Sequence, residues 1–470
     1  MQTSTGRKPA RTQNGDGLPA RLAIMRPIAA LLLCVLAAPA VLAENLQDIF
    51  QIAVKRDPEI RQARATYNAK HTVIDQGRAQ LLPTISATMA GSRDTNGTAN
   101  PSFDAFGNPK QHDFGNGYYS SSYGIRLQQA VVNFQAWYAF QSARKGDESA
   151  TLTLAQSEQQ LIVKVATAYF NVLKSKANLE SFTAEENAAR QVLDQNKQKF
   201  DVGLVTITDV YDSQAAADLA SVNKLVEENN LSRLQEALVA ITGQQVGELA
   251  SLNPNFPIQS ADPDSIEAWV NLAQDNNIAM KIAHLDLDAK QLDAKATRAA
   301  GYPTVALNMS YSWNKSGLSA SFFPAQANEG SSVGLSFSIP LYTGGSRSAQ
   351  IRQADYTRDA FEEALLKSER DNISAARNAY RGVASDVKAV AARAQALVSA
   401  QSAFESTQTG AEVGTRNIVE VVLAQRTLFQ SQRDLANARF TYVLDTIALK
   451  QAAGVLSPQD VTDLNQWLHQ

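Results

Sequence analysis

The sequence has 470 residues, of which 44% are hydrophobic and 19% are charged, and its formal net charge is -3. This composition is ordinary for a chain that packs a core, and it excludes an intrinsically disordered protein. The near-neutral charge leaves no basic surface of the kind that binds a phosphate backbone. We therefore expect no nucleic-acid partner.

The first 43 residues have the features of a secretion signal. Two arginines and an apolar run precede Val41-Leu42-Ala43, which places small residues where a signal peptidase cuts. A transmembrane anchor is the alternative, but the run is well short of the roughly 20 residues that a spanning helix needs. We predict a signal peptide over residues 1–43, and translation could begin at Met1 or Met25.

The single cysteine, Cys34, lies inside this apolar run. Lipid attachment would need a small residue before the cysteine and a polar sequence after it, and neither is present. The mature chain then has no thiol for a disulfide or a thiolate metal site. The four histidines lack ligand spacing, and no phosphate-binding loop or nucleophile motif occurs. We predict no enzyme activity, and no catalytic, cofactor-binding or metal site.

Two halves of the chain match each other at a nearly constant offset of about 211 to 220 residues. LLPTISATM in the first half recurs as GYPTVALNM in the second. DVGLVTITDVYDSQ, from Asp201, recurs as EVGTRNIVEVVLAQ, from Glu412, and the same register still pairs Gly243 with Gly454. A chance match would not keep its register so long, so we predict a two-fold internal repeat.

Each half is predicted to hold an amphipathic helix that runs to a proline, two strands, and a very long helical stretch broken at one glycine. Residues 133–202 contain no proline and only one glycine, so a helix there could rise roughly 100 Å. Beyond Gly414, apolar residues recur every seven positions and predict a coiled-coil seam. The seam residues are Val421, Leu428, Leu435, Tyr442 and Leu449. The first half keeps this register, with an interruption at Lys224.

Apolar and small or polar residues alternate in the predicted strands, most clearly at 119–128, 304–314 and 332–341. This alternation is typical of transmembrane barrel strands, although a strand of a sandwich core would show it too. A closed membrane barrel needs at least eight strands, and an open sheet edge in lipid is forbidden. Four strands therefore predict a barrel shared between copies of the chain, with the loops at 96–117 and 314–330 outside.

Long secreted helices duplicated around paired strands, with VGLVTITDV and VGTRNIVEV at matched turns, resemble the TolC family of outer-membrane efflux and type I secretion channels. The resemblance runs from about Glu44 to the C-terminus. It implies a mainly α fold with a small membrane β part, in which four transmembrane strands per subunit of a homotrimer close a barrel of about twelve strands. A long α-helical coiled-coil tunnel would extend from the barrel into the periplasm.

The function implied is that of an exit duct in the outer membrane, which exports small molecules or proteins for a tripartite efflux pump or a type I secretion system. The implied partners are outer-membrane lipid, a periplasmic adaptor protein, and an inner-membrane pump or ABC transporter. The predicted divisions are the signal peptide, the first repeat, an equatorial girdle segment, the second repeat and a C-terminal girdle segment, at residues 1–43, 44–243, 244–276, 277–454 and 455–470. The residues leave drug efflux and protein secretion both open.

The resemblance also assigns adaptor docking to the periplasmic tips of the two hairpins. The predicted docking residues are Gly203, Leu204, Gly414 and Thr415. A lone glycine between two long helices suits a left-handed backbone and would leave Leu204 and Thr415 exposed. The alternative is that the two glycines serve only as structural turns.

A periplasmic gate just inside the tips is the second implied site. Its predicted residues are Thr208, Asp209, Arg416 and Glu420, with Arg416 linked to the first two on a neighbouring hairpin. The family's tyrosine five residues before the arginine is Ala411 here, and a second aspartate is replaced by Leu423. We therefore expect a latch with fewer links and a ring of three Glu420 carboxylates. The alternative is that Arg416 and Glu420 form an ordinary surface pair one helical turn apart.

Two other functions fit part of the pattern. A periplasmic coiled-coil adaptor or scaffold is also built on helical hairpins, but it should lack membrane strands. A porin-like barrel for uptake would have the strands, but it has no use for helices of this length.

Overall fold

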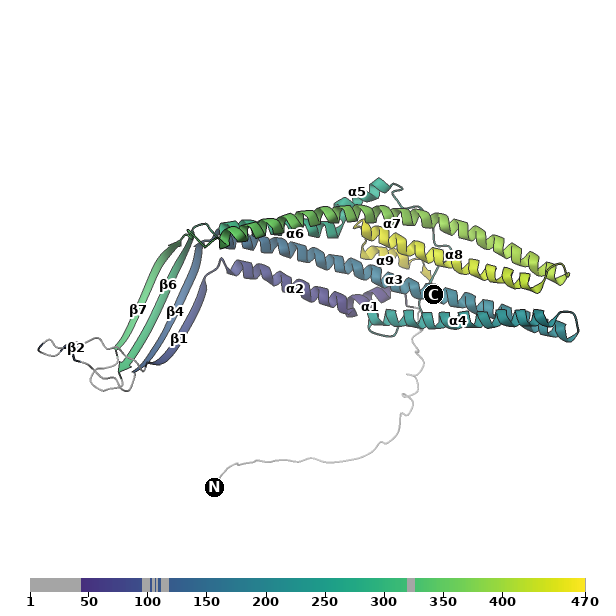
Figure 1. Cartoon of the computed structure of the whole chain (residues 1–470), viewed down its shortest axis with the longest axis horizontal. Helices are drawn as coiled ribbons and strands as arrows, with labels where there is room; N and C mark the ends of the chain where they lie inside the picture. Colours follow the sequence, from purple (N-terminus) through teal and green to yellow (C-terminus); the bar gives the residue numbers. More distant parts are fainter. Residues whose placement is uncertain are drawn as a thin grey trace, which may run out of the picture. The chain divides into compact units, whose positions relative to one another are not determined.

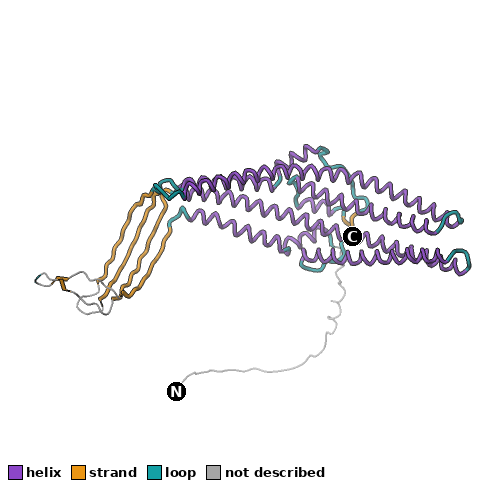
Figure 2. The backbone as a smooth tube through the Cα atoms, viewed as in Figure 1, coloured by secondary structure: helices purple, strands orange, loops and turns teal. Residues whose placement is uncertain are grey.

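The computed structural model describes residues 44–94, 102–103, 106, 109–110, 118–318 and 326–469. The predicted signal peptide, with Cys34, lies outside these residues, as do much of the loop at 96–117 and the middle of the loop at 314–330. In the described part, long helices predominate and four strands form the main sheet (Figures 1 and 2). No described helix is both long enough and apolar enough to cross a membrane.

Each half begins with two helices in place of the single predicted one. They are α1 (Leu46–Arg56) and α2 (Pro58–Ala79) in the first half, and α5 (Ile266–Asn276) and α6 (Ile278–Ala299) in the second. The breaks fall at Asp57 and Asn277, because each side chain accepts hydrogen bonds from backbone N–H groups at the start of the next helix. Pro58 also lacks the N–H that would continue α1.

The long helices form two antiparallel hairpins, α3 with α4 and α7 with α8. Their bounds are α3 (Phe134–Asp201), α4 (Ile207–Thr242), α7 (Ser346–Glu412) and α8 (Ile418–Ala452). With 68 residues in α3 and 67 in α7, each helix rises about 100 Å, which confirms the length predicted for the first. The shorter partners have 36 and 35 residues, so the two hairpins are nearly equal in size.

The predicted seam of α8 is largely buried. Val421, Leu428, Tyr442 and Leu449 are at most 6% exposed, and Leu435 is half-buried. Lys224, which interrupts the register in α4, is also half-buried, and its Nζ lies 3.2 Å from a Glu186 carboxylate oxygen on α3. The interruption is therefore a paired charge within the hairpin.

The largest hydrophobic core gathers halfway along the helices, where α1, α3, α4, α8 and α9 (Pro458–Asn465) contribute buried side chains. Leu46, Tyr169 and Phe170 are fully buried there, and burial of each such side chain contributes about 1.5–3 kcal/mol. The Tyr169 hydroxyl donates to the Ala250 carbonyl oxygen at 2.8 Å. Two short strands, β5 (Ser251–Leu252) and β8 (Leu468–His469), pair beside this core and join the segments that follow the two hairpins.

The main sheet is antiparallel, with the strand order β1-β4-β6-β7. The strands are β1 (Thr84–Asp94), β4 (Tyr118–Val132), β6 (Thr304–Leu318) and β7 (Gln326–Ser338), while β2 (Ser102–Phe103) and β3 (Pro109–Lys110) pair separately. The strand predicted at 332–341 was wrong at its end, because β7 stops at Ser338. Pro340 has no N–H to donate to a ladder, so pairing cannot continue through it.

All four long strands join the helices at the same end of the sheet (Figure 1). Thr84 pairs with Gln128 and Thr304 pairs with Ser338 in the register of the sheet. The connections to α2, α3, α6 and α7 therefore lie together. At the sides of the sheet, β1 and β7 each have one neighbour among the described strands. Their outer backbone N–H and C=O groups are therefore unpaired within the described chain.

Candidate functional site

The sheet has one apolar face that no described element covers. Its side chains alternate along each strand with those of the other face, and five of them are between 54% and 89% exposed: Ile85, Met89, Ile125, Leu335 and Phe337. A soluble monomer rarely exposes so continuous an apolar surface. This face therefore needs lipid or another protein against it.

The opposite face of the sheet is small and hydrophilic. The Ser310 and Ser332 hydroxyl oxygens lie 2.8 Å apart, and the Asn308 amide donates to the Ser336 hydroxyl at 2.9 Å. Along all four strands this face is formed mainly by serine, threonine, asparagine and glycine. Such a surface is suited to water.

Aromatic and charged side chains gather on the apolar face toward the end that lies away from the helices. The rings of Tyr123 and Trp313 stack with centroids 4.7 Å apart, and the Arg93 guanidinium lies 5.5 Å from the Tyr119 ring centroid. Aromatic side chains with a polar partner are typical of the level at which a membrane meets water.

At the far ends of the hairpins, the two turns have the same backbone design. Gly203 and Gly414 have φ angles of 78° and 80°, in the left-handed region that favours glycine. The N–H groups of Leu204 and Thr415 donate at 2.8 Å to carbonyl oxygens five residues earlier. This hydrogen bond closes the C-terminal end of each long helix.

The predicted docking residues differ in what they present at these turns. Leu204 is 75% exposed, and it lies beside Val202, which is 69% exposed. Val413 is the matching apolar residue of the second turn, at 71%. The Thr415 hydroxyl is engaged within its own turn, because it donates to the Gly410 carbonyl oxygen at 3.0 Å.

Of the four predicted gate residues, the single chain brings together Arg416 and Glu420. The Arg416 Nη1 lies 2.6 Å from a Glu420 carboxylate oxygen one turn further along, with both side chains partly exposed. The stem of Arg416 folds back over Gly410, where a Cβ would lie 2.7 Å from its Cγ. Within the described chain, Arg416 thus forms the short-range pair that was the alternative to the latch.

The Asp209 carboxylate has a different role in the single chain. It accepts from the Thr206 N–H at 2.8 Å and from the Thr206 hydroxyl at 2.7 Å, which closes a capping box at the start of α4. In the second turn the cap is Asn417, whose side chain accepts from the Glu420 N–H at 2.8 Å. Sequence reasoning missed both caps, although a threonine three residues before an aspartate is the usual signal.

A buried ion pair joins the two hairpins between α3 and α8. The Arg433 Nη1 lies 2.6 Å from a Glu185 carboxylate oxygen, and both side chains are less than 10% exposed. The guanidinium also lies 4.0 Å from the Phe182 ring centroid. Removing one partner would leave the other charge buried and uncompensated, at a cost of roughly 3–5 kcal/mol, so any shift of α3 against α8 that separates the pair is disfavoured.

A second ionisable pair, Asp386 of α7 and Asp445 of α8, consists of two acids. Gly382 allows their close approach, since a Cβ there would lie 3.3 Å from an Asp445 carboxylate oxygen. Burial, together with the Asp445 carboxylate, raises the pKa of Asp386 to about 6. The protonated form of Asp386 is therefore favoured up to about pH 6 in the folded chain.

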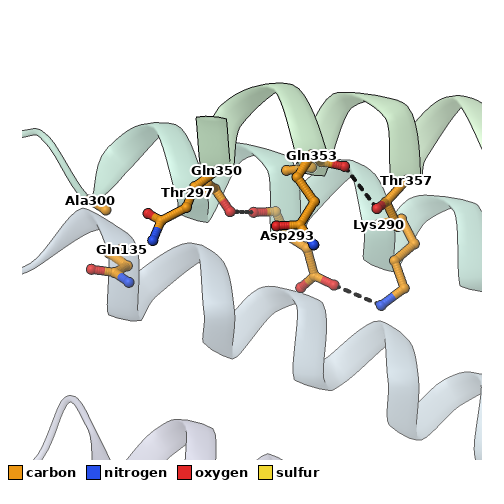
Figure 3. A pocket seen from close by; sticks show the side chains of 9 residues that line it. Gln135, Lys290, Asp293, Thr297, Ala300, Gln350, Gln353 and Thr357 are labelled. Atoms are coloured by element: carbon orange, nitrogen blue, oxygen red, sulfur yellow. Dashed lines mark hydrogen bonds and ion pairs between the residues drawn. The ribbon is translucent and has the colours of Figure 1, made fainter. Parts of the chain in front are cut away.

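A cavity of about 320 Å³ lies between α6, α7 and the start of α3 (Figure 3). Lys290 and Asp293 pair on its wall at 2.9 Å, and the Gln350 and Gln353 side chains of α7 lie opposite them. The lining is polar and carries no nucleophile beside a base. Among the described residues, no group of three or more histidine, cysteine, aspartate or glutamate side chains could hold a metal ion.

Comparisons with known proteins match these features. The family model described as "Outer membrane efflux protein" matches residues 49–244 and 269–455. The outer membrane protein TolC of Vibrio cholerae is 33% identical over 430 residues, which cover 91% of this chain and 95% of that protein. The alkaline protease secretion protein AprF of Pseudomonas aeruginosa is 25% identical, over 89% of this chain and 86% of that protein.

Among solved structures, the outer membrane protein VceC of Vibrio cholerae has the same fold. The TM-score is 0.74 at 18% sequence identity, and the alignment covers 87% of this chain and 96% of that one.

The acid pair predicts how stability depends on pH. Because the pKa of Asp386 is higher in the folded chain than in the unfolded one, the folded chain binds more protons between about pH 4 and 6, and stability falls as pH rises through that range. Asp386→Asn should therefore stabilise the protein at pH 7.5, by about 1–2 kcal/mol after allowance for solvent screening. Thermal unfolding in detergent, followed by circular dichroism, measures the effect.

At pH 4 the advantage of the variant should nearly vanish. Asp434→Asn is the matched control on α8, because the Asp434 carboxylate lies 2.7 Å from the Arg393 guanidinium and has no acid beside it. The control should not raise stability at pH 7.5. An Asp386→Asn protein that is less stable than wild type at pH 7.5 would contradict the raised pKa of Asp386.

Proposed function

This chain belongs to the outer membrane efflux protein family and is an outer-membrane exit channel for efflux or type I secretion, and on that premise we propose how it assembles and opens. Its copies form a homotrimer in which four transmembrane strands from each subunit close one barrel. The long helices continue the barrel as a periplasmic tunnel. The adaptor or scaffold function is set aside by this family membership.

The observation that carries the proposal is the sheet with an uncovered apolar face and two unpaired side edges. Four strands are too few to close a barrel, and free edges in lipid leave backbone groups without partners at several kcal/mol each. Because β1 and β7 run antiparallel, β7 of one copy can pair with β1 of the next. The apolar face then meets lipid, and the hydrophilic face lines the pore.

The proposed divisions of the chain follow the two halves. A two-fold repeat over 44–243 and 277–454 is supported by the paired hairpins of nearly equal length and by the matched glycine turns. The segments 244–276 and 455–470 were predicted to form the girdle, but α5 within the first of them matches α1, so the second repeat would begin at about Ile266. The girdle would then consist of residues 244–265 and 455–470, and the pairing of β5 with β8 favours this grouping. Residues 1–43 would be the signal peptide.

We assign adaptor docking to the hairpin tips and no catalytic role to any residue. A periplasmic adaptor protein would contact Leu204 and the apolar residues beside the Gly203 and Gly414 turns, and it would connect the tunnel to an inner-membrane pump or ABC transporter. The support is exposure, since Leu204, Val202 and Val413 are between 69% and 75% exposed. Thr415 would contribute through its backbone and methyl group, because its hydroxyl is bonded within the turn.

Docking at the tips predicts that Leu204→Glu abolishes export, because a charge would have to be desolvated in an apolar contact. The change lies on an exposed side chain, so the trimer should persist in detergent by light scattering. Val226→Glu is the matched control, since Val226 is 63% exposed on α4 but lies far from the tip. Export should be measured with an intact pump. Normal export by an assembled Leu204→Glu protein would refute docking at this residue.

The gate is proposed to close when the hairpins of neighbouring copies meet near the tips. Arg416 would exchange its Glu420 partner for Thr208 and Asp209 of the adjacent hairpin. In both states Arg416 would make its ion pair at an exposed position, so each pair contributes less than about 1 kcal/mol. The exchange of partners would therefore be readily reversed. The Glu420 carboxylates, freed from Arg416, would form an acidic ring that attracts cations.

Two substitutions in planar bilayers test this gate. Arg416→Glu should raise the conductance, because it removes the cation that links neighbouring hairpins. Glu420→Ala should weaken cation selectivity and block by multivalent cations, because the ring loses its charge. Glu412→Ala, on the other side of the same turn, serves as the control. If both gate variants conduct and select as the wild type does, the assignment fails while the exit channel stands.

A further inference from the structure

The hydrophilic face of the sheet carries a single charge in its interior, the guanidinium of Arg126. In the register, Arg126 lies on β4 between Ser86 of β1 and Ser310 of β6. Serine side chains are short, so the arginine extends beyond its neighbours, and it is exposed. In the described part of the chain, no carboxylate forms an ion pair with it.

The other charges of the sheet lie away from Arg126. Arg93, Lys315 and Glu329 belong to the apolar face by the alternation of the strands, at the end far from the helices. Asp94 is the last residue of β1, roughly 27 Å along the strand from Ser86 at 3.4 Å per residue. No opposite charge on the described strands is therefore near enough to neutralise Arg126.

We propose that the Arg126 side chains of the assembled copies form a ring of positive charge on the pore wall, which binds anions and favours anionic cargo. This rests on the proposed trimeric barrel, in which the hydrophilic face of the sheet lines the lumen. An arginine is charged at every physiological pH, so the ring is permanent. Rings of one sign of charge set selectivity in other pores by the same electrostatics.

With this ring, the two ends of the duct would prefer ions of opposite charge. Arg126 lies within the sheet, whereas the Glu420 carboxylates lie at the far ends of the hairpins. A multivalent anion that enters from the sheet end meets the arginines first, and a multivalent cation that enters from the tip end meets the carboxylates. The side from which each blocker acts therefore separates the two rings.

The test uses purified full-length protein in planar bilayers, with the tetravalent anion hexacyanoferrate(II) added to each side in turn. Wild type should be blocked from one side. Arg126→Gln should weaken this block about tenfold, since three charges acting on a tetravalent ion over about 10 Å are partly screened at 0.1 M salt. Arg126→Lys should keep the block, because it keeps the charge.

Arg93→Gln is the matched control, because it removes the same charge from the opposite face of the same sheet. Hexacyanoferrate(II) should block the Arg93→Gln channel as strongly as it blocks wild type. Light scattering in detergent checks that each variant is assembled, and Arg126→Ser, which copies the neighbouring residues, replaces Arg126→Gln if that variant does not assemble. An assembled, conducting variant without Arg126 that is blocked as strongly as wild type would overturn the ring. A monomeric, non-conducting wild type would instead overturn the trimeric barrel, and the ring with it.

Discussion

The backbone along the outer sides of β1 and β7 has N–H and C=O groups that no described strand of the chain pairs. In water such edges are tolerable, but in lipid each unpaired group costs several kcal/mol. The same sheet has an apolar face that water disfavours. Contact with lipid would bury the apolar face favourably, but it would leave the backbone groups of the edge strands without hydrogen bonds. Pairing between the edge strands of neighbouring copies would remove that cost. The proposed assembly follows from this conflict.

In the proposed assembly, the sheet determines which helices of neighbouring copies lie side by side. Because all four strands join α2, α3, α6 and α7 at one end of the sheet, the proposed pairing between edge strands would set those helices of neighbouring copies side by side. Within each copy, the Arg433 and Glu185 pair and the apolar seams hold the hairpins together. The proposed assembly would then position the tip residues. Among the described residues, Arg416 forms its ion pair with Glu420, so the proposed latch would have to come from a neighbouring copy.

Local patterns predicted much of this fold from the sequence. The long stretch without proline, which ends at a glycine, predicted the length of α3, and the matched glycines predicted both turns. These signals are readable in the sequence because each depends on local backbone conformation. Contacts between distant segments were not predictable. The pairing of Lys224 with Glu186, and of Asp386 with Asp445, depends on how two helices meet. At the candidate gate, the sequence offered the short-range pair of Arg416 and Glu420 as an alternative to the latch, and the structure shows this pair. The spacing of Thr206 and Asp209 could also have predicted the cap at the start of α4.

Disulfide trapping of the edge strands tests closure between copies most directly. Cysteine at Ser86 on β1 is combined, in a Cys34→Ala background, with cysteine at one β7 position of the same face: Ser332, Gly334, Ser336 or Ser338. Cysteines whose Cα atoms lie 4.4–6.8 Å apart can bridge, so at least one combination should give a covalent trimer in outer membranes. Partners on the opposite face, such as Leu335→Cys, should not. Monomers alone from every combination would contradict a barrel shared between copies.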